Sequence, residues 1–87
     1  MMSSTELARG IRAFNKGRYE EAHRVLEPLA HSGELRAQLI VARLYYAGNG
    51  VEQSDSQYRY WLEQCAASGD KSSRARLKKL RKQGEPE

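Results

Sequence analysis

The segment from Leu44 to Gln53 reads LYYAGNGVEQ, and its GNG triplet separates two kinds of fold. A glycine-rich loop that binds phosphate follows a buried strand, whereas glycines that join two helices follow a helix. The residues before Gly48 have helical periodicity, and the Lys-Ser/Thr pair of a P-loop is missing after Gly50. The triplet therefore predicts a helix connection in which Gly48 ends one helix and Ser54 begins the next.

Length and composition limit the classes of protein that fit. The chain has 87 residues, which predicts one small domain with too little core to enclose a deep catalytic cavity. Cys65 is the only cysteine, so it excludes an intrachain disulfide and a cysteine zinc cluster, and we expect it in the core. No leader pattern and no run of roughly 18 apolar residues is present, so we expect a cytoplasmic protein without a membrane segment.

Apolar periodicity and capping residues predict five helices and no strand. Ser3 with Glu6 and Ser54 with Gln57 read as capping boxes at the starts of the first and fourth helices. The first expected helix ends near residue 15, and the second and third cover residues 19–31 and 34–47. The fourth begins at residue 54, and the fifth covers residues 70 to about 83. The expected inner faces carry Leu7, Ile11 and Phe14; Ala22, Val25, Leu26 and Leu29; Tyr58, Trp61, Leu62 and Cys65; and Ser73, Leu77 and Leu80.

An internal repeat organises these helices. The segment LEPLAHSG at residues 26–33 aligns with LEQCAASG at residues 62–69, an offset of 36 positions that is typical of helix-turn-helix repeats. We therefore expect an all-α fold, an α-solenoid of about two repeats over residues 4–33 and 34–69. The thin apolar stripe of residues 70–83 is typical of a capping helix, and residues 84–87 are expected to form a flexible tail.

The second repeat resembles the Sel1-like family. The residues that match its pattern are Ala37, Val41, Ala42, Tyr45, Gly48, Gly50, Val51, Trp61, Ala66 and Gly69. Gly10 and the segment 17–22 look like part of a preceding tetratricopeptide-type unit. Ala42, Ser54, Tyr58 and Cys65 depart from the residues that are usual in the family. The resemblance implies a noncatalytic adaptor that binds another protein or peptide, without cofactor.

The third predicted helix carries two apolar stripes. Ala37, Ile40, Val41, Leu44 and Tyr45 form the core stripe, and Leu39, Ala42 and Tyr46 lie roughly opposite, beside Arg36 and Arg43. The second stripe either lines a binding groove or packs on the first helix. By the resemblance, Arg36, Leu39, Arg43 and Tyr46 face the ligand, and Ala75, Lys79 and Lys82 are their counterparts on the last helix. Such a groove suits a peptide with apolar anchors and acidic groups.

Other chemistry-bearing residues favour surface roles. His23 and His31 are eight residues apart with no carboxylate at a completing spacing, so we expect solvent-facing histidines and no metal site. The glutamates of the repeat helices lie beside basic residues, which indicates a solvated surface rather than an acid–base pair. These are Glu20, Glu21, Glu27 and Glu63. The sequence therefore predicts no enzyme.

The basic last helix supports an alternative of another class. It carries Lys71, Arg74, Arg76, Lys78, Lys79, Arg81 and Lys82. These cations could bind nucleic acid or another polyanion nonspecifically, with Tyr46 or Tyr60 stacking on a base. Against this, no nucleic-acid-binding module is recognisable, and the charges alternate with core residues as in a solvated cap. Tyr60 lies off the core face, so it is either a surface residue or part of an interface, including one with a second copy.

Overall fold

Five helices follow one another along the part of the chain that the structure describes. This computed structural model describes residues 2–84, and the side chains of residues 5–84. The helices are α1 (Met2–Asn15), α2 (Tyr19–His31), α3 (Leu35–Ala47), α4 (Asp55–Ala67) and α5 (Lys71–Gly84), and no strand occurs within residues 2–84. The predicted all-α class and five helices are confirmed. The Ser3 side chain and residues 85–87 of the expected tail lie outside the described part.

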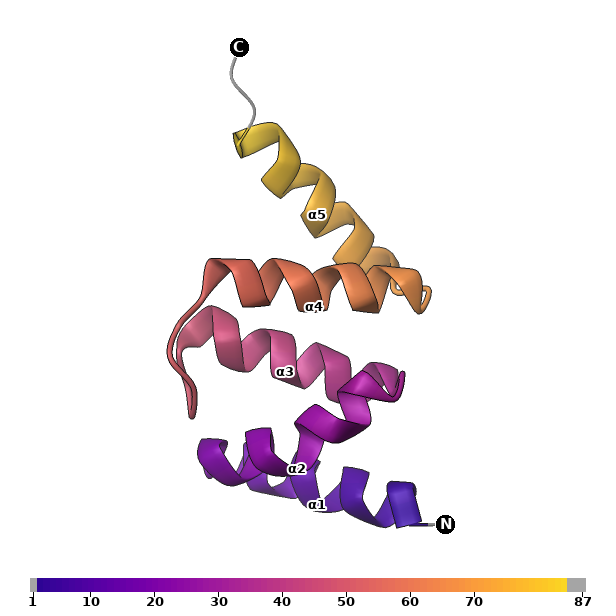
Figure 1. Cartoon of the computed structure of the whole chain (residues 1–87), viewed down its shortest axis with the longest axis vertical. Coiled ribbons are helices and arrows are strands. Elements are labelled where there is room, and N and C mark those ends of the chain that lie inside the picture. The colour runs from indigo at the N-terminus through magenta and orange to yellow at the C-terminus, as the bar shows by residue number, and fades with distance from the viewer. Residues whose placement is uncertain (1, 85–87) are drawn as a thin grey trace.

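Each helix packs on the next helix along the chain. The third helix, α3, lies between α2 and α4 and also touches α1. Among the described residues, α5 packs on α4 only, and Figure 1 shows it projecting from the end of the molecule. The result is an elongated body with extents of 47 × 25 × 17 Å.

The core lies on both sides of α3. The largest fully buried side chains are Trp61, Leu26, Leu44, Val41 and Cys65. Most of the predicted inner residues of α2, α3 and α4 are buried, as expected. The exceptions are only half-buried: Val25, Ile40, Tyr45 and Tyr58, together with the whole predicted inner face of α1, which is Leu7, Ile11 and Phe14. On α5, Ser73 is buried while Leu77 and Leu80 are half-buried. The inner stripe of α5 is thus less covered than those of α2, α3 and α4, because α5 contacts a single helix within the described residues.

Ala42 is buried, not part of an outer stripe. Its exposed fraction is 3%, and it belongs to the main core cluster, which corrects the placement predicted from the sequence. The buried arc of α3 extends past Val41 to Gln38 and Ala42, because α2 and α4 cover two sides of this helix rather than one. Leu39 and Tyr46, by contrast, are exposed.

A buried glutamine joins three helices. Gln38 is 4% exposed, and its Nε2 donates to the carbonyl of Ala30 at 3.1 Å. Its Oε1 accepts from the Ser68 hydroxyl at 3.1 Å. Ala30 lies in the last turn of α2, and Ser68 caps the C-terminus of α4. Both ends of the amide are therefore satisfied, and one side chain on α3 links the ends of α2 and α4.

The two Ser-Gly turns adopt the same conformation. Ser32 has φ −84° and ψ 2°, and Ser68 has φ −84° and ψ 3°. The following residues, Gly33 and Gly69, have φ of 101° and 100°. In both turns the next amide donates to a carbonyl five residues earlier, at 3.1 Å and 3.0 Å. Positions 36 residues apart in the sequence therefore share backbone geometry as well as side-chain identity.

The GNG triplet is the predicted helix connection. Gly48 is left-handed, with φ 72°, and its N–H donates to Leu44 at 2.8 Å. The Ser54 hydroxyl accepts from the Gln57 N–H at 3.1 Å, which confirms the cap. The Ser54 N–H donates to the Tyr45 carbonyl at 3.2 Å, so only half of the predicted capping box forms.

The same loop contacts the start of α2. Figure 1 shows the segment between α3 and α4 extending beside the helices of the first repeat. At Gly50, with φ 75°, a Cβ atom would lie 2.5 Å from the Tyr19 carbonyl carbon and 2.7 Å from the Glu20 nitrogen. Glycine is therefore required at position 50 for two reasons: the backbone has a positive φ, and the backbone of α2 lies too close for a side chain.

Gly50→Ala is expected to destabilise the protein more than Gly33→Ala. Both residues have positive φ, which costs an L-residue about 1–2 kcal/mol, but Gly33 has open space around a new Cβ. Gly50→Ala also forces the loop away from α2, which adds roughly 1–3 kcal/mol. Urea unfolding followed by circular dichroism measures both variants. Equal losses would show that the loop does not rest on α2.

Candidate functional site

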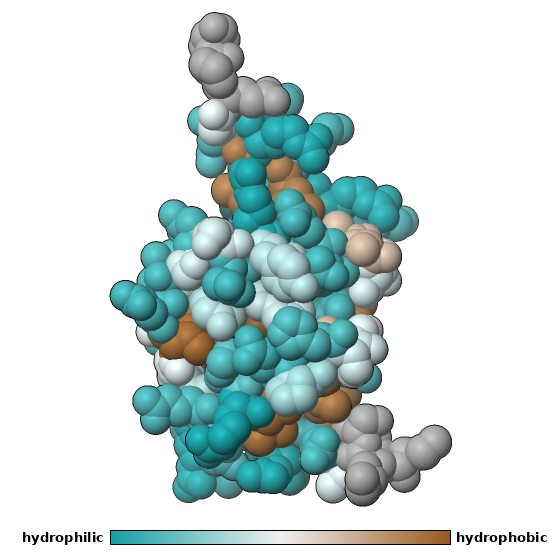
Figure 2. All heavy atoms as spheres, in the orientation of Figure 1, coloured by the Kyte–Doolittle hydropathy of each residue, from teal (hydrophilic) through white to brown (hydrophobic). Residues whose placement is uncertain are grey.

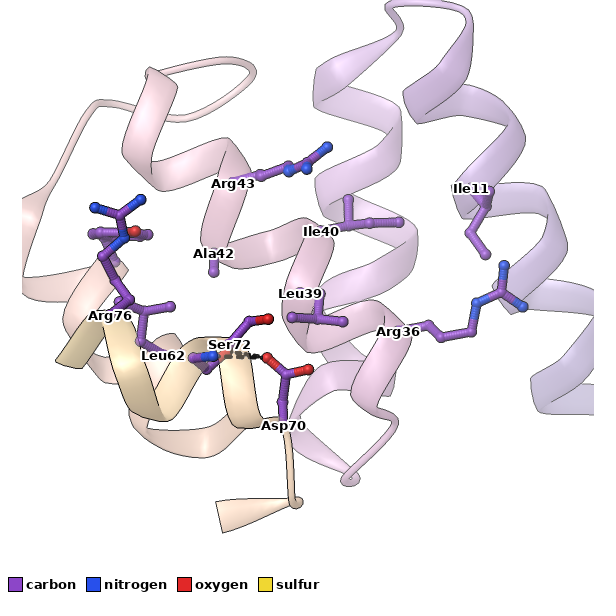
Figure 3. A pocket seen from close by; sticks show the side chains of 12 residues that line it. Ile11, Arg36, Leu39, Ile40, Ala42, Arg43, Leu62, Asp70, Ser72 and Arg76 are labelled. Atoms are coloured by element: carbon purple, nitrogen blue, oxygen red, sulfur yellow. Dashed lines mark hydrogen bonds between the residues drawn. The ribbon is translucent and has the colours of Figure 1, made fainter. Parts of the chain in front are cut away.

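A groove of about 470 Å³ opens between α3 and α5, with α4 as its floor. Figure 3 shows Leu39 and Ala42 on α3 near Leu62, Asp70 and Ser72, with Ile11 of α1 at the far end. The lining residues are Ile11, Arg36, Leu39, Ile40, Ala42, Arg43, Tyr58, Leu62, Asp70, Ser72, Ser73 and Arg76. The groove exists because α5 packs on α4 without reaching α3.

The centre of the groove is apolar. Leu39 on α3 is 36% exposed, and Leu62 on α4 is nearly buried at 6%. Tyr58 is half-buried, and its ring lies 4.8 Å from that of Tyr46, which is 63% exposed. The Tyr46 ring therefore extends the apolar surface beyond Tyr58 toward the C-terminus of α3. A ligand that covers Leu39 and Tyr46 removes apolar area from water.

Three arginines surround the apolar centre. Arg36 and Arg43 come from α3, and Arg76 comes from α5. Within the described part of the chain, none of them has a carboxylate within 4.0 Å. In Figure 3 the Arg36 and Arg43 side chains both extend from α3 toward the first repeat, and Arg76 lies on the α5 side, so the three guanidinium groups do not converge on one point. This arrangement fits a ligand with several separated anionic groups better than a ligand with a single carboxylate.

A helix cap positions the α5 side of the groove. Asp70 Oδ2 accepts from the Ser73 N–H at 2.9 Å and from the Ser73 hydroxyl at 2.6 Å. The fully buried Cys65 lies beneath this cap. Burial raises the pKa of the Cys65 thiol, the Ser73 hydroxyl opposes the rise, and the negative charge of Asp70 adds to it. Asp70, Ser73 and Cys65 thus attach the first turn of α5 to α4.

The groove includes some of the residues singled out from the sequence. Arg36, Leu39 and Arg43 line it, and Tyr46 adjoins it through Tyr58. Lys79 and Lys82 are exposed but lie farther along α5 and do not line the groove. Ala75, their expected companion, is also outside the lining.

Two α5 residues in the groove come from an unexpected face. Ser72 is the counterpart, 36 positions later, of the predicted ligand-facing Arg36. Ser73 and Arg76, however, are the counterparts of Ala37 and Ile40, which lie on the core side of α3. The equivalent face of α5 stays open because α5 does not reach α3. The sequence contains no signal for this gap, so it does not indicate Arg76 as a groove residue and places Tyr58 and Leu62 in the core alone.

Tyr60 lies on another surface. It is 42% exposed, and its ring meets that of Trp61 edge-on, with centroids 5.0 Å apart. The His31 ring contacts Trp61 as well, at 4.8 Å. Tyr60 does not line the groove, so a role in self-association stays a prediction separate from the groove.

His23 is not the solvent-facing residue that the sequence predicts. Its side chain is 21% exposed, with Nε2 at 3.3 Å from Glu27 Oε1 and 3.2 Å from the Tyr45 hydroxyl. The prediction failed because Tyr45 reaches across from α3 and covers this part of α2. Burial and the negative charge of Glu27 raise the pKa of Tyr45. His31 is exposed, as expected.

The described residues contain neither a metal site nor a membrane span. Within them, no group of three or more His, Cys, Asp or Glu side chains is placed to hold a metal ion. None of the five described helices combines the length and apolar character needed to cross a bilayer. Figure 2 shows a largely hydrophilic face with small hydrophobic areas, one on α5 and others lower on the molecule.

Comparison with known proteins does not identify the chain. No protein-family model matches it, and neither the curated proteins nor the solved structures give a significant match. The Sel1-like and tetratricopeptide-like resemblance therefore stays a prediction from the residues quoted above.

Cys65 is expected to make the protein less stable at alkaline pH. Because its pKa is raised in the folded state, its contribution is complete below the ordinary thiol pKa and is lost as the pH rises through the folded value. In that window the free energy of unfolding should fall by up to about 1.4 kcal/mol per pH unit. Urea unfolding of wild type and Cys65→Ala across this range measures the difference in slope. Parallel pH dependences would contradict a buried thiol at this position.

Proposed function

We propose that this protein is a noncatalytic adaptor that holds an acidic peptide segment of a partner protein in the groove between α3 and α5. The observation that carries the proposal is an apolar groove surrounded by Arg36, Arg43 and Arg76, none of which is paired with a described carboxylate. The apolar anchors of such a peptide would cover the apolar centre of the groove, and its separated carboxylates would neutralise the three arginines.

We further propose that the scaffold is a short α-solenoid of the Sel1-like and tetratricopeptide-like kind. Two observations support this. Each helix packs on its neighbour along the chain, and the turns after α2 and α4 share one backbone geometry at an offset of 36 residues. In such a scaffold, α5 is the terminal cap, and its thin apolar stripe leaves it attached to α4 alone.

The polar groups of the groove favour binding over catalysis. Among the lining residues, Asp70 and Ser73 are the close carboxylate–hydroxyl pair that resembles a base and a nucleophile. Ser73 is only 3% exposed, and Asp70 accepts from both its backbone and its side chain as a helix cap. A hydroxyl held in that way is turned into the α4–α5 contact and away from an occupant of the groove.

Peptide display against the immobilised protein tests the proposal. We expect the selected peptides to combine one or two large apolar residues with at least two Asp or Glu residues. Leu39→Asp places a carboxylate in the apolar centre, and Arg36→Gln with Arg43→Gln removes two cations. Each variant should lower the affinity of a selected peptide by about tenfold or more, as measured by isothermal titration calorimetry.

Tyr60→Ala is the matched control. It removes an exposed aromatic side chain outside the groove, so peptide affinity should not change. Circular dichroism checks that the groove variants remain folded, which is expected because Leu39, Arg36 and Arg43 are all exposed. Peptides that bind wild type and Leu39→Asp equally would disprove the groove as the binding site.

A further inference from the structure

The helix α5 presents a long side that none of the other described helices covers. Within residues 2–84 it packs on α4 only, and its far side carries five exposed cations, which we call the outer face of α5. The outer face consists of Lys71, Arg74, Lys78, Arg81 and Lys82. Their spacing of three, four, three and one residues places them on one side of the helix. Arg76, which lines the groove, lies on the opposite side.

The charges of the outer face are not compensated within the described part of the chain. No described carboxylate lies within 4.0 Å of any of the five cations. Arg74 makes one long contact, to the Ala66 carbonyl at 3.4 Å. The first turn of α5 has no acidic residue. Like charges three or four positions apart destabilise a helix, so this face carries repulsion that an external anion would relieve.

Arg81 and Lys82 are a partial exception to this repulsion. They lie in the last turn of α5, where cations interact favourably with the helix dipole. Lys71, Arg74 and Lys78 receive no such compensation. The repulsion is therefore concentrated in the first two turns, next to the contact with α4.

We infer that the outer face of α5 binds the phosphate backbone of a nucleic acid without reading its sequence. At a rise of about 1.5 Å per residue, Lys71 and Lys82 are about 16 Å apart along the helix. At about 3.4 Å per nucleotide along a strand, this length spans about five phosphates, which matches the number of cations. Long, flexible Lys and Arg side chains can each reach a phosphate, and no base-reading groups accompany them.

A nucleic acid fits this face better than a membrane or an acidic protein. An interfacial helix inserts its apolar side into lipid, but Leu77 and Leu80 follow the buried Ser73 on the side that packs on α4 and are half-buried there. A protein partner would need an apolar centre to its interface, and the outer face offers only cations and the methyl group of Ala75.

This inference concerns a second site and does not depend on the proposed groove. The outer face and the groove lie on opposite sides of α5, so a peptide in the groove and a nucleic acid on α5 would not compete for space. A chain with both sites would bring a protein partner to a polyanion.

Fluorescence anisotropy with a labelled DNA duplex of about 20 base pairs, a labelled single strand and an RNA strand of that length tests the inference. With five phosphate contacts, the slope of log K against log salt for the duplex should be about −4.5. Affinity should therefore fall about 500-fold between about 50 mM and about 200 mM salt. Replacing Lys71, Lys78, Arg81 and Lys82 by Gln should reduce the slope to about −0.9.

A charge-matched variant is the control. Replacing Arg12, Lys16, Arg18 and Arg24 by Gln removes the same number of exposed cations from the first repeat, and these residues form no described ion pair. The control should keep a slope near that of wild type. If both variants lose binding equally, net charge alone is responsible and the inference is wrong.

Two further measurements distinguish the outer face from the groove and a nucleic acid from a membrane surface. Leu39→Asp should bind the oligonucleotides like wild type, which distinguishes a failure of the groove from a failure of the outer face. Binding to phosphatidylserine vesicles without binding to any of the three oligonucleotides would overturn the inference in favour of a membrane surface. The α5 variant should remain folded, because Gln is about as good a helix former as Lys and Arg, and the removal of like-charge pairs offsets the lost dipole interaction of Arg81 and Lys82.

Discussion

The burial of α3 between α2 and α4 is the contact on which the rest of the structure depends. Ala37, Val41 and Leu44 are fully buried along one side of α3. On the adjoining side, the Gln38 amide bonds to the ends of α2 and α4. Because these contacts position two helices at once, they also position the turn after α2 and the turn after α4. The exposed strip that remains on α3, with Leu39 and Arg43, becomes one wall of the groove.

The helix α5 is attached by fewer contacts than α3. It depends on one partner helix, a short apolar stripe, and the cap of Asp70 and Ser73 above Cys65. A helix held in this way has two free sides. One side forms the wall of the groove opposite α3, and the other carries the outer face of cations. The contact with a single helix therefore explains both why α5 has little core and why two of its sides are free to bind partners.

Positive charge is concentrated in α5, away from the described ion pairs. The described ion pairs, Arg9 with Glu21 and His23 with Glu27, both lie in α1 and α2. The arginines of the groove and the cations of α5 have no such partners in the described chain. The net charge of +4 therefore understates the positive character of α5, whose sequence KSSRARLKKLRKQG contains no acidic residue. Such a concentration raises the rate at which anionic partners encounter this helix.

The sequence by itself determined the five helices, the GNG connection, the Ser54 cap and the burial of Trp61 and Cys65, because periodicity, capping and glycine conformation are local properties. Only the tertiary structure decided that Ala42 and Gln38 are buried, that His23 is covered by Tyr45, and that Arg76 lines the groove where Lys79 and Lys82 were expected. Each of these depends on which side of a helix a distant segment covers. In particular, nothing local to residues 70–84 records that α5 would reach α4 and stop short of α3, and that gap forms the groove.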